Sequence, residues 1–134
     1  MNLIVFDTQA LLAFYLGELG ADKVEEYLDL VGEKKLKAYI NIVNLAELYY
    51  ILARESKDVA EEKERNLKSF GVNVVSVIDR YGLWRKAAEI KAANTVSLAD
   101  AFAAATAISM NGTLVTAADT EFDTTRNLKI EHIQ

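Results

Sequence analysis

Four acidic residues stand where this sequence predicts that strands end or helices begin. Asp7 and Asp119 each follow a short, mainly apolar run. Glu47 and Asp100 each lie in the predicted first turn of a helix. In a parallel α/β sheet, strand ends and the following helix starts lie at one edge, where ligands bind. We therefore expect the four carboxylates to converge at that edge.

Converging carboxylates predict a metal-dependent chemistry. They repel one another unless a cation is present, and Mg²⁺ or Mn²⁺ prefers such oxygen ligands. The sequence has no Cys and only one His, so a thiolate zinc site is excluded and a His base is disfavoured. A site built from acids alone suits phosphoryl chemistry on a polyanion, with bound metal orienting and deprotonating a water.

Each acid also has a purely structural explanation. Asp7 fits a helix cap, and Asp119 fits the start of a final turn. Glu47 has capping-box spacing from Asn44, and Asp100 would complement the dipole of its helix. These explanations do not account for all four acids falling on one predicted edge.

The elements that would position these acids alternate along the chain. Apolar runs predict strands at 2–6, 36–43, 72–77, 113–116 and 128–133, the last with the alternation of an edge strand. Helical patterns lie between them at 9–16, 20–30, 44–54, 58–68, 79–93 and 98–108. Thr8, Asn44 and Ser97 are expected to cap helices. The alternation predicts an α/β fold with a mainly parallel sheet.

Length and composition set further bounds. We expect a single domain over residues 1–134, and 51% hydrophobic residues exclude a disordered chain. The net charge of −5 disfavours nucleic-acid binding through bulk positive charge, although bound cations would offset clustered acids locally. The apolar runs fall short of the roughly 18 residues of a membrane span. With no signal-peptide pattern at the start, we expect a cytoplasmic protein.

The segments around the acids resemble the four motifs of the PIN domain family. The segments are Val5–Thr8, Asn44–Leu48, Ser97–Ala101 and Leu114–Phe122. Their order and spacing match, and the resemblance covers essentially the whole chain. The most similar type is the small VapC-like toxin of prokaryotic toxin–antitoxin pairs.

The resemblance implies a three-layer α/β/α sandwich and a Mg²⁺- or Mn²⁺-dependent endoribonuclease acting on RNA. The catalytic acids that it implies are Asp7, Glu47, Asp100 and Asp119. The first, third and fourth of these would hold the metal. Thr8 and Thr116 match the hydroxyl residues that support such a site. The resemblance also implies an antitoxin partner and a homodimer.

Two departures from the family pattern lie in the motifs. Gln9 stands where many relatives have Ser or Asn. Both Ala117 and Ala118 precede Asp119, where many relatives have one residue after the motif Thr. Asp123 is therefore an alternative fourth acid.

The sequence is also compatible with two other functions on the same fold, and it disfavours two further classes of α/β protein. A PIN nuclease could process RNA without an antitoxin, and a non-catalytic protein-binding module could keep the same fold. A phospho-accepting receiver domain would need a pair of acids at the first strand end and a Lys after a late strand, and the chain has neither. Phosphatases of the haloacid dehalogenase type need a second Asp where Gln9 stands.

Overall fold

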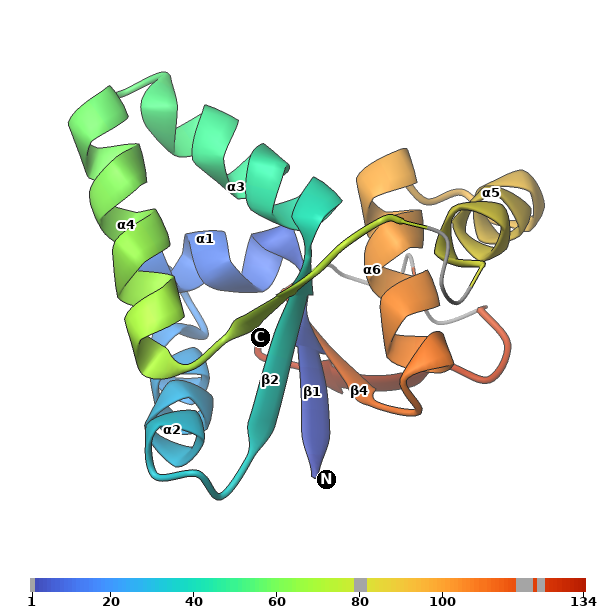
Figure 1. Ribbon diagram of the computed structural model, residues 1–134, viewed down its shortest axis with the longest axis horizontal. Coiled ribbons are helices and arrows are strands. Elements are labelled where there is room, and N and C mark those ends of the chain that lie inside the picture. Colours follow the sequence, from blue (N-terminus) through green and yellow to red (C-terminus); the bar gives the residue numbers. More distant parts are fainter. Residues whose placement is uncertain (1, 79–81, 118–121, 123–124) are drawn as a thin grey trace.

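A parallel five-stranded sheet forms the centre of the protein (Figure 1). The computed structural model describes residues 2–78, 82–117, 122 and 125–134. The strand order is β3-β2-β1-β4-β5, and every neighbouring pair runs parallel. The strands are β1 (Leu3–Phe6), β2 (Lys37–Asn41), β3 (Asn73–Val75), β4 (Thr113–Thr116) and β5 (Lys129–His132). The predicted parallel sheet and its last edge strand are confirmed.

Helices cover both faces of this sheet (Figure 1). They are α1 (Thr8–Leu16), α2 (Ala21–Gly32), α3 (Ile42–Ala53), α4 (Lys57–Phe70), α5 (Leu83–Ala93) and α6 (Leu98–Ser109). Helices α1 to α4 lie on one side, and α5 and α6 lie on the other. The expected α/β/α sandwich is therefore confirmed. No helix among the described residues is long and apolar enough to cross a membrane.

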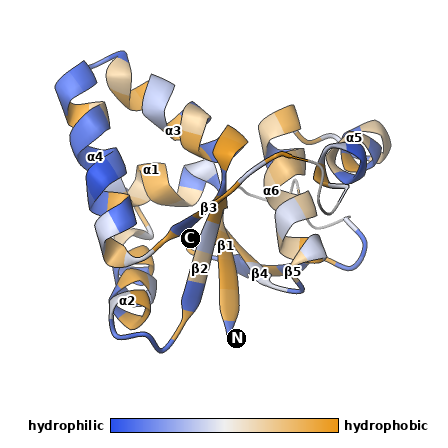
Figure 2. Ribbon diagram, viewed as in Figure 1, coloured by the Kyte–Doolittle hydropathy of each residue, from blue (hydrophilic) through white to orange (hydrophobic). Residues whose placement is uncertain are grey.

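The central strand β1 supplies the core on both faces. Ile4 and Phe6 pack in one cluster with side chains of α1 to α4. Val5 packs in a second cluster with α5 and α6. All three side chains are fully buried, which explains why β1 reads as an unbroken apolar run. In Figure 2, β1 has the colour of hydrophobic residues, whereas most of α4 has the colour of hydrophilic ones.

The junction between β2 and α3 differs from the prediction. The strand expected over 36–43 ends at Asn41, and α3 begins at Ile42. Asn41 is the N-cap, because its Oδ1 accepts a hydrogen bond from the backbone N–H of Val43 at 2.9 Å. Asn44 is buried inside the helix, so the predicted capping box with Glu47 is wrong. The two Asn residues are equally good caps by type, and the β-branched pair after Asn41 favoured a longer strand.

Smaller differences occur at other element ends. Asp7, in an extended backbone conformation, caps α1, and Thr8 is the first helical residue rather than the predicted cap. β3 covers only 73–75 of the predicted 72–77, and the side chains at 77 and 78 are exposed beyond its end. Ser97 caps α6 as expected. The start predicted for α5 at 79 falls outside the described residues, and the helix itself begins at Leu83.

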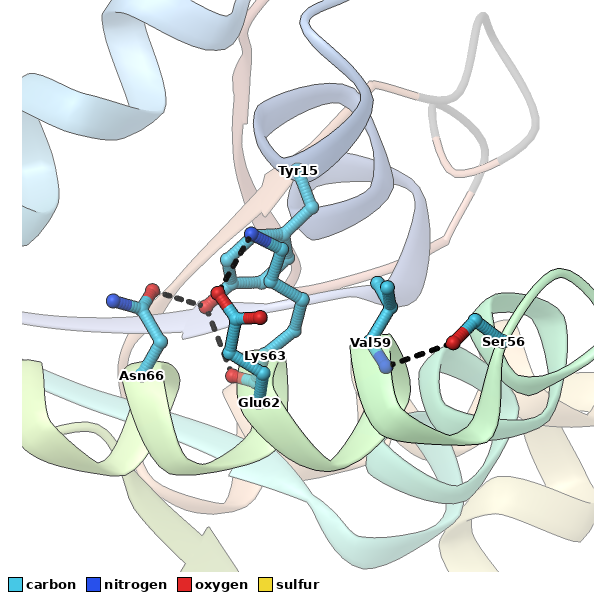
Figure 3. A network of polar contacts seen from close by, with 6 residues as sticks. All are labelled: Tyr15, Ser56, Val59, Glu62, Lys63 and Asn66. Carbon is cyan, nitrogen blue, oxygen red and sulfur yellow. Dashed lines mark hydrogen bonds and ion pairs between the residues drawn. The ribbon is translucent and has the colours of Figure 1, made fainter.

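A tyrosine hydroxyl links α1 to α4 (Figure 3). The hydroxyl of Tyr15 lies 2.9 Å from Oδ1 of Asn66 and 3.2 Å from the carbonyl oxygen of Lys63. The Tyr15 ring is half-buried and meets Phe14 edge-on, with 5.0 Å between ring centroids. This contact fixes α4 against the helix that follows Asp7.

Replacing Tyr15 should therefore weaken the fold without disturbing its packing. Tyr15→Phe removes only the hydroxyl, and we expect the free energy of unfolding to fall by about 1 kcal/mol, as for one net hydrogen bond. Tyr50→Phe is the matched control, because the Tyr50 side chain is 46% exposed. Urea unfolding of both variants would measure this, and an equal loss in the two would contradict the assigned role of Tyr15.

Candidate active site

Asp7 lies at the carboxyl end of the central strand and is fully buried. Its backbone N–H donates to the carbonyl oxygen of Val115 at 3.2 Å, which extends the pairing of β1 with β4 by one residue. Its Oδ1 accepts the N–H of Ala10 at 2.8 Å, and its Oδ2 accepts the hydroxyl of Thr116. Both carboxyl oxygens are thus held by protein donors from α1 and β4.

The surroundings of Asp7 favour its protonated form. Burial raises the pKa of the Asp7 carboxyl from 3.8 to about 7. The hydrogen bonds from Thr116 and Ala10 lower this pKa, but the negative charges of Asp100 and Glu47 raise it further. A cation beside Asp7 would reverse the balance, because a positive charge favours the ionised form.

Asp100 and Glu47 approach Asp7 from two other helices. Asp100 is in the first turn of α6, where its N–H donates to Oγ of the cap residue Ser97 at 3.1 Å. Glu47 is the sixth residue of α3, one turn further along the helix than predicted. Both side chains are half-buried, and both act electrostatically on Asp7. The three acids therefore share one region at the carboxyl edge of the sheet.

The fourth predicted acid lies outside the described residues, as does its alternative. These two residues are Asp119 and Asp123. Within the rest of the chain, no three His, Cys, Asp or Glu side chains are placed to hold a metal ion together. The described donors near Asp7 are nonetheless carboxylate oxygens, the ligand type that suits Mg²⁺ or Mn²⁺. The set fits such an ion, and its complete ligand list stays a prediction.

Of the two predicted supporting hydroxyls, that of Thr116 contacts Asp7, whereas that of Thr8 contacts the backbone of α3. Thr116 is fully buried at the end of β4 and donates to Asp7. Thr8, the residue after Asp7, donates from Oγ1 to the backbone carbonyl oxygen of Asn44 at 3.1 Å. Strand pairing of β1 with β4 explains the first contact, because residues far apart in sequence become neighbours at one edge.

Asn44 is a site neighbour that sequence reasoning did not identify. It is fully buried, and its Nδ2 donates to the carbonyl oxygen of Ala99 at 3.0 Å. A signal was present in the sequence, since Asn44 lies four and eight residues before Leu48 and Leu52. All three side chains lie on the buried side of α3. A lone amide on an apolar helix face indicates a buried hydrogen-bonding role.

Comparison with known proteins places the chain in a family. The family model of the PIN domain matches residues 4–128, so this chain belongs to the PIN domain family. A comparison with curated protein sequences finds no significant match.

Solved structures of toxin–antitoxin complexes have a similar fold. VapBC2 from Rickettsia felis, bound to a DNA fragment from its promoter, matches with a TM-score of 0.77 and 22% identity, covering 97% of this chain and 98% of that one. DNA-bound VapBC from Salmonella typhimurium matches with a TM-score of 0.76 and 20% identity over all of both chains. VapBC-5 from Mycobacterium tuberculosis matches with a TM-score of 0.60 and 22% identity, covering 100% and 99%.

The raised pKa of Asp7 predicts a pH-dependent stability in metal-free buffer. Between about pH 4 and pH 7 the folded chain keeps a proton on Asp7 that the unfolded chain has released, so the free energy of unfolding falls as the pH rises. The shift corresponds to about 4 kcal/mol at most, at roughly 1.4 kcal/mol per unit. Urea unfolding with EDTA across this range should show a steeper fall for the wild type than for Asp7→Asn. Parallel pH profiles would contradict the buried, protonated carboxyl.

Proposed function

We propose that this chain is a Mg²⁺- or Mn²⁺-dependent endoribonuclease and the toxin of a type II toxin–antitoxin pair. The observation that carries the proposal is the fully buried carboxyl of Asp7, on which the charges of Asp100 and Glu47 act. A pKa of about 7 leaves this carboxyl only partly ionised at neutral pH, and a cation beside it would favour the ionised form. Proteins of the PIN domain family are generally nucleases, which supports hydrolysis of phosphodiester bonds.

The acids would bind the metal ion, and neighbouring donors would orient them. Asp7 and Asp100, with Asp119 as the predicted third ligand, would hold the ion. When bound, the divalent cation supplies a Lewis acid that activates water and offsets charge on the phosphoryl group. Ala10 and Thr116 hold the Asp7 carboxyl in one orientation by a hydrogen bond to each oxygen.

Glu47 is assigned a role in proton transfer rather than in metal binding. Its side chain is half-buried in the second turn of α3, and its negative charge raises the pKa of Asp7. A carboxylate at that place would take up the proton that the attacking water loses.

The partner proposal rests on similarity of fold and on exposed apolar side chains. The similar solved structures are complexes of a toxin with an antitoxin. An antitoxin and a second copy of the chain would cover apolar side chains that are exposed here. Among them are Leu16, Leu19, Ile78, Trp84 and Leu98. We propose that one domain spanning the chain carries both the catalytic edge and these contact surfaces.

Cleavage assays on RNA test the enzymatic part of the proposal. We expect cleavage with Mg²⁺ or Mn²⁺ and none with EDTA. Asp7→Asn and Asp100→Asn should each lose more activity than the roughly 10–100-fold typical of an outer-shell partner, because they remove ligands themselves. Asp29→Asn, on the exposed face of α2, should keep wild-type activity. Full cleavage by Asp7→Asn, or by the wild type in EDTA, would refute the proposal.

Growth of bacteria that express the chain tests the toxin part. Expression of the wild type alone should arrest growth, and expression of Asp7→Asn should not, because only the former degrades RNA. Coexpression of a small DNA-binding protein encoded beside this gene should restore growth. RNA cleavage without growth arrest would favour an RNA-processing nuclease that has no antitoxin. A wild type that neither binds metal nor cuts RNA would favour a protein-binding module.

A further inference from the structure

Asn44 makes polar contacts with two other elements of the site. Its Nδ2 donates to the carbonyl oxygen of Ala99 on α6 at 3.0 Å, and lies 3.4 Å from Oγ1 of Thr8 on α1. Thr8 in turn donates to the backbone carbonyl oxygen of Asn44 at 3.1 Å. One fully buried residue of α3 therefore joins the starts of α1 and α6, which lie at the same end of the sheet (Figure 1).

These contacts fall directly beside the two central acids. Thr8 is the residue after Asp7, and Ala99 is the residue before Asp100. The contacts span 36 and 55 positions of sequence, so no local structure would otherwise fix this spacing. Asp100 acts electrostatically on Asp7, so the spacing of the backbone that carries the two acids sets the strength of that interaction.

Stability alone does not explain why an amide stands at this position. Oδ1 of Asn44 is buried and accepts no hydrogen bond within the described part of the chain. This unpaired buried acceptor carries a desolvation penalty, which offsets part of the stability that the Nδ2 contacts contribute. Leu has nearly the same shape as Asn and would pack with the buried Leu48 and Leu52 of the same helix face.

We propose that Asn44 is a positioning residue that holds Asp7 and Asp100 at the spacing a divalent cation requires. It acts through the backbone on either side of the acids, and it does not itself bind the ion. This inference rests on the proposed metal-dependent function and adds to it a named residue that keeps the site preformed.

Asn41 provides a matched control. It is also fully buried, and it precedes α3 directly. Its Nδ2 donates to Oγ1 of Thr106 at 2.9 Å, so it too joins the start of α3 to α6. Thr106 lies six residues after Asp100, away from the first turn. Asn41 therefore tests whether any buried amide between these helices affects the site.

The experiment compares Mn²⁺ affinity with stability in Asn44→Leu and Asn41→Leu. Calorimetry measures Mn²⁺ binding, and urea unfolding measures the fold. Asn44→Leu should weaken Mn²⁺ binding by at least about ten-fold, as loss of an outer-shell partner does, while its free energy of unfolding falls no further than that of Asn41→Leu, which also loses a buried hydrogen bond to α6. Asn41→Leu should lose stability, because it removes a helix cap, and should keep wild-type Mn²⁺ affinity.

Two further measurements keep the proposal open to refutation. RNA cleavage by Asn44→Leu should recover at saturating Mn²⁺, since the acids themselves remain. Thr8→Val removes the hydroxyl that donates to the backbone of Asn44, and it should also weaken Mn²⁺ binding. This variant tests the proposal if Asn44→Leu does not fold. Wild-type affinity in Asn44→Leu, or in Thr8→Val if only that variant folds, would overturn the role of Asn44 alone. Absence of Mn²⁺ binding by the wild type would overturn the proposed function, and this inference with it.

Discussion

A carboxyl group buried at the end of the central strand is the constraint on which the site depends. β1 lies between β2 and β4, so the residue at its carboxyl end is covered by neighbours on both sides. Placing Asp7 there carries a free-energy penalty for the charged form, which is why its pKa rises to about 7. Donors from α1 and β4 offset part of that penalty, and a cation would offset the rest. A surface carboxylate would need none of these arrangements.

The parallel topology explains how one edge collects all of these groups. In a parallel sheet a helix that directly follows a strand begins at the carboxyl edge, as α1 and α3 do, and α6, which leads into the start of β4, begins there as well. α1 begins there with the cap Asp7, α3 brings Glu47 within its second turn, and α6 presents Asp100 in its first turn. Asn44 connects the three helix starts through hydrogen bonds. The fold thus supplies a shared edge, and a buried polar link sets the spacing within it.

Much of this arrangement could be predicted from the sequence, and the exceptions have physical causes. β1, β4 and the cap Ser97 are specified locally, by an apolar run or by a residue type that N-cap positions prefer. The prediction of the β2–α3 junction is wrong because Asn41 and Asn44 are equivalent cap residues by type, and both contact α6 in the folded chain. The contact of Thr116 with Asp7 follows from the strand order, which local patterns do not encode. Membership of the PIN domain family was visible from motif order, whereas the link through Asn44 required coordinates.

Mn²⁺ binding tests the central claim, that Asp7 and Asp100 serve a single cation site, more directly than any other measurement. Calorimetric titration of the wild type, Asp7→Asn and Asp100→Asn at one pH would separate the possibilities. The account predicts saturable binding by the wild type and loss of that binding in each variant, with the fold intact by circular dichroism. Binding that survives in both variants would place the ion elsewhere and contradict the account.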